Sequence, residues 1–294
     1  MKMLDMQGMI INNPKNIEYL TGIKAEGVLL ITRKENIFLT DGRYIEDAKS
    51  ILTIDDEITV YEFNDFSKDE YENFFMFCEN VGFEEDYITY SQYKNYMSKY
   101  KINNLQETEK VIEKQRMIKD EEEIEKLSKA CEITDKCFKH LLEFIKVGKT
   151  EKEIEYEIEK FFNENGADGG VSFEPIVASG CNSSKPHAVP TDKKIDVGDP
   201  ITIDFGCKYQ GYCSDMTRTI FMGYVPEDIK SIYDLVLQNQ LQVQIMEMLQ
   251  GKHSKLIGVQ PLMTRVPGVH SPQRSGSICS IPEQWQMTVP GTRT

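Results

Sequence analysis

Two aspartates, Asp204 and Asp215, are the side chains in this sequence best spaced to bind a metal ion. They lie in the segment ITIDFGCKYQGYCSDMTR (201–218), a pattern that predicts two strands joined by a turn near residues 208–211. Apolar residues alternate with Asp204 in the first strand, so this aspartate is expected on the polar face. With the turn centred between Tyr209 and Gln210, the two aspartates stand directly opposite each other, with Cβ atoms about 5 Å apart.

Two carboxylates at this separation repel each other unless a cation lies between them. Hard oxygen ligands of this kind suit a divalent metal ion, so the spacing indicates a metal site. The same spacing also fits two solvated aspartates on the polar side of a hairpin. Spacing alone leaves both interpretations open.

The elements that support this hairpin are predicted upstream of it. Residues 120–146 carry apolar side chains at three- and four-residue intervals, and Asp120 and Glu123 occupy capping-box positions, which predicts a helix. Thr150 and Glu153 repeat the capping signal for a second helix. Strands are then expected over 173–178, 201–205 and 217–221. Helices followed by a run of strands indicate an α+β domain.

The first hundred or so residues show a different sequence pattern, in which short apolar runs alternate with turn residues. This pattern predicts strands over 27–32, 37–40, 58–63 and 81–83. The intervening stretches 68–79 and 91–99 are rich in charge and predict surface helices covering a sheet. An α/β N-terminal domain is therefore expected.

Several strings resemble the metallopeptidases of the pita-bread fold, which include methionine aminopeptidase, prolidase, Xaa-Pro aminopeptidase and creatinase. The strings that are similar to the catalytic domain are SGCNSSKPHAVP (179–190), DVGDPITIDFGCKYQGYCSDMTRT (196–219) and KQRMIKDEEEIEKL (114–127). Those that resemble the creatinase-like N-terminal domain of the proline-specific branch are NIEYLTGI (16–23), TDGRY (40–44) and VGFEEDYITYSQY (81–93). The resemblance implies an α/β N-terminal domain over 1–112 and an incomplete α+β pita-bread catalytic domain over 113–257.

The resemblance implies a metal-dependent exopeptidase that cleaves the bond between an N-terminal residue and proline, acting on peptides with proline at the second position. Asp204 would bind one of two divalent ions and Asp215 would bridge both, with manganese expected and cobalt or zinc as alternatives. His187 would be the catalytic and substrate-binding residue that helps to stabilise the tetrahedral intermediate. Without that motif, a histidine in a loop rich in Ser, Asn and Pro is more often an exposed polar residue.

The sequence departs from the family where the remaining ligands are expected, a His in a His-Gly strand and two later glutamates. The histidines and glutamates that follow Asp215 are His253, His270, Glu227, Glu247 and Glu283. None lies in a matching motif, and two aspartates alone offer too few donors, so impaired hydrolysis is expected. One alternative is a non-catalytic relative that binds a peptide or protein partner with a decayed metal site. Another is an incomplete product of an active ancestor.

The last residues, 258–294, differ in composition from the rest of the chain. They contain one acidic residue, Glu283, and five scattered prolines, which disfavour helices and central strands. This composition predicts a disordered tail. A translated wrong reading frame or a foreign junction is the alternative explanation.

Bulk properties limit the remaining classes of function. The formal net charge of −14 disfavours binding to a nucleic-acid backbone, and neither a membrane span nor a secretory signal is expected. The seven cysteines, without a C-x-x-C pair, are expected to be reduced thiols in the cytoplasm. The family resemblance also implies a homodimer as a possible assembly.

Overall fold

The computed structural model describes residues 6–52, 57–249 and 264–266. The chain divides into two compact units, Met1–Lys119 and Asp120–Thr294, whereas the sequence placed the boundary after residue 112. The tail expected over 258–294 lies outside the described residues apart from Thr264–Val266, which form a short strand. None of the described helices combines the length and the apolar character that crossing a bilayer requires.

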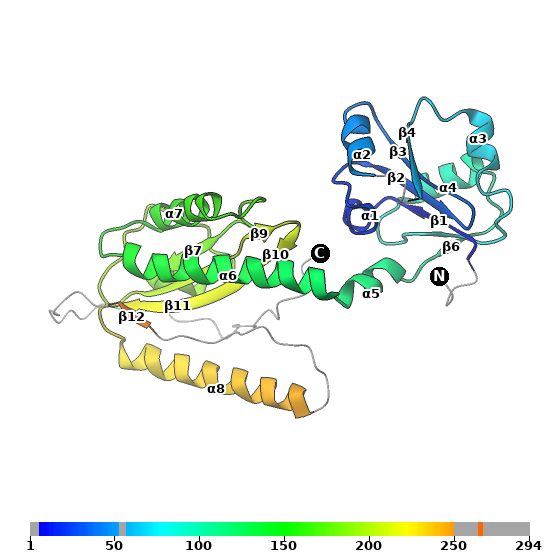
Figure 1. The fold of residues 1–294 in the computed structure, drawn as a ribbon. Coiled ribbons are helices and arrows are strands. Elements are labelled where there is room, and N and C mark those ends of the chain that lie inside the picture. The colour runs from blue at the N-terminus through cyan, green and yellow to red at the C-terminus, as the bar shows by residue number, and fades with distance from the viewer. Residues whose placement is uncertain (1–5, 53–56, 250–263, 267–294) are drawn as a thin grey trace. The chain divides into compact units, whose positions relative to one another are not determined.

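The first unit is a six-stranded mixed sheet flanked by helices (Figure 1). Its strands are β1 (Gly8–Ile11), β2 (Gly27–Thr32), β3 (Asn36–Thr40), β4 (Ile58–Glu62), β5 (Val81–Phe83) and β6 (Leu105–Glu107). Its helices are α1 (Pro14–Thr21), α2 (Ile45–Ile51), α3 (Lys68–Asn73), α4 (Tyr90–Lys99) and α5 (Val111–Met117). The strand order is β4-β3-β2-β1-β5-β6, and β1 pairs antiparallel with β2 and parallel with β5.

Both faces of this sheet are buried, which explains the continuous apolar runs in its strands. Successive residues of β1 enter different hydrophobic clusters, with Ile10 in one and Ile11 in the other. The cluster containing Ile10 also holds Tyr96 and Tyr100 from the region of α4, and the cluster containing Ile11 holds Ile17 from α1. The α/β character expected for the N-terminal domain is therefore confirmed.

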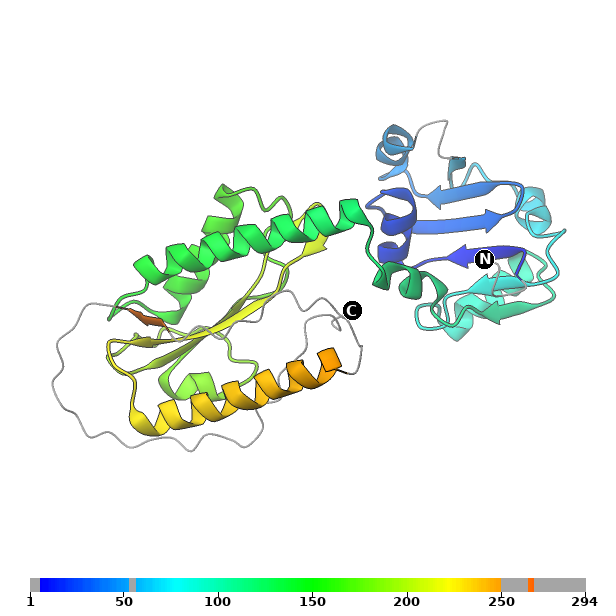
Figure 2. The same ribbon diagram turned by 60° about the horizontal axis from the view of Figure 1, so that its bottom comes forward.

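The second unit contains a four-stranded sheet with the order β12-β11-β8-β7. Its strands are β7 (Ile176–Ser179), β8 (Pro200–Phe205), β11 (Met216–Met222) and β12 (Thr264–Val266), with β9 (Lys208–Tyr209) and β10 (Tyr212–Cys213) forming a two-stranded ribbon. Its helices are α6 (Glu121–Phe144), α7 (Glu151–Glu164), α8 (Glu227–Leu249) and the 3₁₀ helix η2 (Gly180–Ser184). Both ribbon views place α6 and α7 on one face of the sheet and α8 on the other (Figures 1 and 2).

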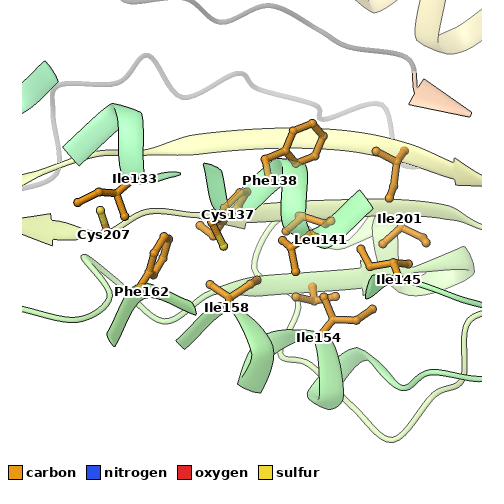
Figure 3. Close-up of a cluster of buried hydrophobic side chains, with 14 of the residues drawn as sticks. Ile133, Cys137, Phe138, Leu141, Ile145, Ile154, Ile158, Phe162, Ile201 and Cys207 are labelled. Carbon is orange, nitrogen blue, oxygen red and sulfur yellow. The ribbon is translucent and has the colours of Figure 1, made fainter. Parts of the chain in front are cut away.

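The helices α6 and α7 start where the sequence predicts them. Asp120 and Thr150 are their N-caps, and both capping boxes are formed, with Glu123 and Glu153 as the reciprocal partners. The apolar faces of the two helices close over one side of the sheet in a single core (Figure 3). Side chains that meet there are Cys137, Leu141, Ile154, Ile158, Phe162, Ile201, Ile203 and Phe205. The opposite side of β8 is thereby left for polar residues.

Candidate metal centre

The turn between β9 and β10 sets the register of the hairpin that carries the two aspartates. Gln210 and Gly211 occupy its central positions with φ values of 47° and 86°. Two successive positive φ angles are typical of a type I′ turn, whose second position favours glycine because glycine has no Cβ. The hairpin is therefore centred between Gln210 and Gly211. The sequence-based centre between Tyr209 and Gln210 is wrong.

The corrected register changes how Asp204 and Asp215 face each other. Asp204 pairs with Thr217, so the prediction that Asp204 lies directly opposite Asp215 is wrong. Asp215 precedes Thr217 by two positions, which makes it the diagonal neighbour of Asp204 across the hairpin. Diagonal neighbours in an antiparallel pair lie about 7–8 Å apart at their Cα atoms, within reach of a shared ligand. A metal ion bound by both carboxylates requires this diagonal geometry instead of direct pairing.

The face that carries Asp204 is rich in oxygen atoms. Asp204 lies opposite Thr217, and Thr202 lies opposite Thr219 on the same face. Thr217 Oγ1 donates a hydrogen bond of 2.9 Å to Asp204 Oδ1, and Oδ2 has no donor among the described residues. Thr202 Oγ1 is buried, and no described residue forms a hydrogen bond with it. Carboxylate and hydroxyl oxygens are the ligands that hard divalent cations prefer.

Ser214, the residue before Asp215, is held on all sides. Its N–H donates to Cys207 O at 2.9 Å, and its Oγ accepts from Cys207 N at 2.9 Å. Its Oγ also lies 2.6 Å from Thr134 Oγ1 on α6, and its carbonyl oxygen accepts from Ser172 Oγ at 2.9 Å. These contacts fix the backbone from which the Asp215 side chain projects. Sequence reasoning did not find Ser214, because its partner Thr134 is distant in the chain.

Replacing Ser214 by alanine is expected to destabilise the second unit by about 1–3 kcal/mol, because the buried Cys207 N–H loses its partner and the Thr134 hydroxyl keeps its bond to Ala130 O but loses the one to Ser214. Urea denaturation followed by circular dichroism measures this loss. Ser231→Ala is the matched control, since Ser231 Oγ bonds Glu227 O on an exposed part of α8, and its cost is expected within about 0.5 kcal/mol. Equal costs for the two variants contradict the anchoring role of Ser214.

His187 lies in the connection that follows β7 and η2, and its side chain is exposed. The neighbouring Ala188 and Pro190 are buried, whereas Val189 is exposed, so buried and exposed side chains alternate along this stretch. The structure therefore presents His187 at the surface of the second unit, outside the core under α6 and α7.

The donor set available to a metal ion is a pair of carboxylates. Asp204 and Asp215 can supply hard, anionic oxygens to one side of a divalent ion, which fits the chemistry of such a group. Among the described residues, no cluster of three or more His, Cys, Asp or Glu side chains is arranged to hold a metal. These two aspartates therefore suit part of a coordination shell and do not complete one.

Comparison with known proteins identifies two family regions in the chain. The model of metallopeptidase family M24 matches residues 125–252, and that of the Creatinase/Prolidase N-terminal domain matches residues 1–118. These regions cover nearly all of the first unit and residues 125–252 of the second, and they include Asp204, Asp215 and His187. Family membership of this kind implies divalent metal ions.

Individual relatives agree with this assignment. The chain is 38% identical over 240 residues to the uncharacterised peptidase YqhT of Bacillus subtilis, covering 81% of this chain and 67% of that protein. It is 34% identical over 234 residues to an Xaa-Pro dipeptidase of Pyrococcus furiosus, covering 79% of this chain and 65% of that protein. The chain thus spans about two thirds of the length of these curated relatives.

Solved structures show the same two-domain fold. An Xaa-Pro dipeptidase from Bacillus anthracis superposes with a TM-score of 0.72 at 37% identity, covering 80% of this chain and 66% of that one. An X-Pro aminopeptidase from Thermotoga maritima gives a TM-score of 0.70 at 30% identity, with coverages of 81% and 69%. The expected creatinase-like N-terminal domain and partial pita-bread domain are confirmed. The chain therefore belongs to metallopeptidase family M24, a family of hydrolases, and carries the Creatinase/Prolidase N-terminal domain.

Proposed function

We propose that this protein is a metal-dependent exopeptidase that cleaves the bond between an N-terminal residue and proline. The observation that carries the proposal is the diagonal placement of Asp204 and Asp215 on the oxygen-rich face of the β8–β11 hairpin, opposite the core. The similarity to an Xaa-Pro dipeptidase and an X-Pro aminopeptidase supports proline specificity. Dipeptides and longer peptides are both candidate substrates.

The roles of the residues follow from their chemistry. Asp204 and Asp215 would hold a divalent pair, for which manganese is the first candidate, and Thr217 would fix the orientation of Asp204 through its hydrogen bond. Bound ions would supply Lewis-acid polarisation of the scissile carbonyl and a more acidic water. His187, exposed on its loop, would contact the peptide and donate a hydrogen bond to the oxygen that becomes negative during attack.

The activity of this chain by itself is proposed to be low. Two carboxylates leave most of the coordination positions of a metal pair without protein ligands, and the described residues offer no third His, Cys, Asp or Glu side chain beside them. The same observation favours a second candidate function, a non-catalytic relative that binds a peptide or protein. The two functions differ in whether metal addition produces turnover.

Peptide hydrolysis tests the proposal. The full chain is incubated with manganese and with an Xaa-Pro dipeptide, an Xaa-Pro-Yaa tripeptide or an Xaa-Ala control, and released product is quantified. Slow, metal-dependent turnover of the proline peptides alone is expected, and Asp204→Asn should remove it. Binding of the peptides without metal-dependent turnover would contradict the proposal that this chain is an enzyme. It would favour the non-catalytic peptide-binding function.

The nucleotide sequence across codons 245 to 294 offers an independent check. Translation in all three frames is expected to reveal a His-Gly strand and two glutamates in a shifted frame. If no frame encodes the His-Gly strand and the two glutamates, the hypothesis of an incomplete product loses its support. The non-catalytic alternative is then favoured.

A further inference from the structure

Glu151, the first residue of α7, holds a carboxylate that the fold buries completely, with 0% of the residue exposed. A buried carboxylate is costly unless hydrogen bonds replace its hydration. The helix N-terminus does not need Glu151 as a cap, because Thr150 and Glu153 already form the capping box there. Its side chain is therefore placed for another purpose.

The donors to Glu151 come from both ends of one loop, residues 179–191. At one end, Ser179 donates from its N at 2.7 Å and from its Oγ at 2.9 Å to Oε1. Asn182 Nδ2 lies 3.2 Å from Oε1 and 3.1 Å from Oε2. At the other end, Thr191 donates to Oε2 from its N at 3.0 Å and from its Oγ1 at 2.6 Å. One carboxylate thus ties together two points that are separated by the length of the loop.

These bonds keep Glu151 charged at neutral pH. Burial alone would raise the pKa of the Glu151 carboxyl, but the hydrogen bonds from Thr191, Ser179 and Asn182 outweigh it, and the pKa lies below its usual value. The position at the start of α7 also favours a negative charge, because the helix dipole is positive there. The charged form is the one that accepts bonds from every donor at once.

The backbone adds a second attachment at the same place. Lys152 N donates to Thr191 O at 3.2 Å, and Glu151 N donates to Lys193 O at 3.1 Å. Between the two attachment points, Ala188 is buried with 6% exposure and His187 points to the surface. A short stretch that is fixed at both ends and buried at alternate positions has little freedom to redirect the side chains between them.

We infer that Glu151 is a positioning residue that fixes both ends of the loop carrying His187 and thereby sets the direction of the His187 imidazole. The inference rests on the proposed role of His187 toward the peptide. Glu151 does not touch the substrate in this scheme and acts through the loop alone. Its side chain joins the first turn of α7, the end of β7 and the segment entering β8 in one hydrogen-bonded unit.

Hydrogen exchange and NMR on the full chain test this inference. Glu151→Gln turns one acceptor oxygen into an N–H₂ group that faces donors, so the amides of Ser179 and Thr191, which bond the carboxylate, and of Lys185, which bonds Asn182 O within the loop, should exchange about tenfold faster. The ring resonances of His187 should shift and broaden. In the matched control Glu153→Gln, which removes a carboxylate charge from the same turn but keeps a side chain able to complete the capping box, the amides of this loop should exchange as in the unchanged chain.

A second variant keeps the test decisive if Glu151→Gln does not fold. Thr191→Val removes a single hydroxyl donor, so the amides of Lys185 and Thr191 should exchange faster while β7 and α7 keep their protection. Unchanged loop exchange and unchanged His187 resonances in the folded variants overturn the inference, as does a loosening spread evenly over the second unit. Neither readout requires turnover, so failure of the proposed hydrolysis would be recognised separately.

Discussion

Replacing Gly206 by alanine is expected to destabilise the second unit by about 3 kcal/mol or more, near the upper end of the range for overpacked sites. A Cβ at this position would overlap the carbonyl oxygen of Ser214 and come within 2.6 Å of Ser172 Oγ. The Ser214 backbone cannot retreat easily, because its N–H and its Oγ are both bonded to Cys207. Urea denaturation monitored by circular dichroism measures the loss.

Gly42→Ala is the matched control for this substitution. The nearest atom to a Cβ at Gly42 is the flexible end of Glu62, at 3.3 Å, and the site is exposed, so a change within about 0.5 kcal/mol is expected. A cost for Gly206→Ala as small as that of the control would contradict the close approach of the two hairpin segments.

Replacing either Asp204 or Asp215 by asparagine is expected to weaken manganese binding at least about tenfold, because an amide oxygen is a neutral and poorer donor than a carboxylate. Both variants should fold, since the side chains are half-buried or exposed and the core lies on the other face. Calorimetric titration of the full chain with manganese measures the affinity.

Asp192→Asn controls for the loss of surface charge in this titration. Asp192 is exposed and pairs with Lys152 at 2.9 Å, so its removal lowers the net negative charge without changing the hairpin. Its manganese affinity should equal that of the unchanged chain. If all three variants lose affinity equally, the binding is a diffuse effect of charge and Asp204 and Asp215 are not ligands.

The supporting elements could be predicted from the sequence because their signals are local. The capping boxes at Asp120 and Thr150 and the alternation of Ile201, Ile203 and Phe205 each depend on residues a few positions apart. The central strand β1 was missed, because four consecutive buried residues, GMII, carry no alternation. Its identity is decided by pairing with β2 and β5, which are distant in the chain.

The geometry of the candidate site depends on details that spacing cannot give. A difference of one residue in the centre of the turn moves the partner of Asp204 from Asp215 to Thr217. Gly211 was the available signal, since glycine favours the second position of a type I′ turn, but Gln210 at positive φ is not suggested by its residue type. The hydrogen bonds from the loop to Glu151 could not be predicted from the sequence. A glutamate in the first turn of a helix is already explained by the helix dipole.

A crystal of the full chain soaked in manganese provides the most direct test of the central claim that Asp204 and Asp215 bind a divalent metal together. An anomalous difference peak is expected roughly 2 Å from a carboxylate oxygen of each residue, a distance typical of metal–carboxylate bonds. Its absence from crystals in which both side chains are ordered, or a peak bound to other residues alone, would contradict the claim.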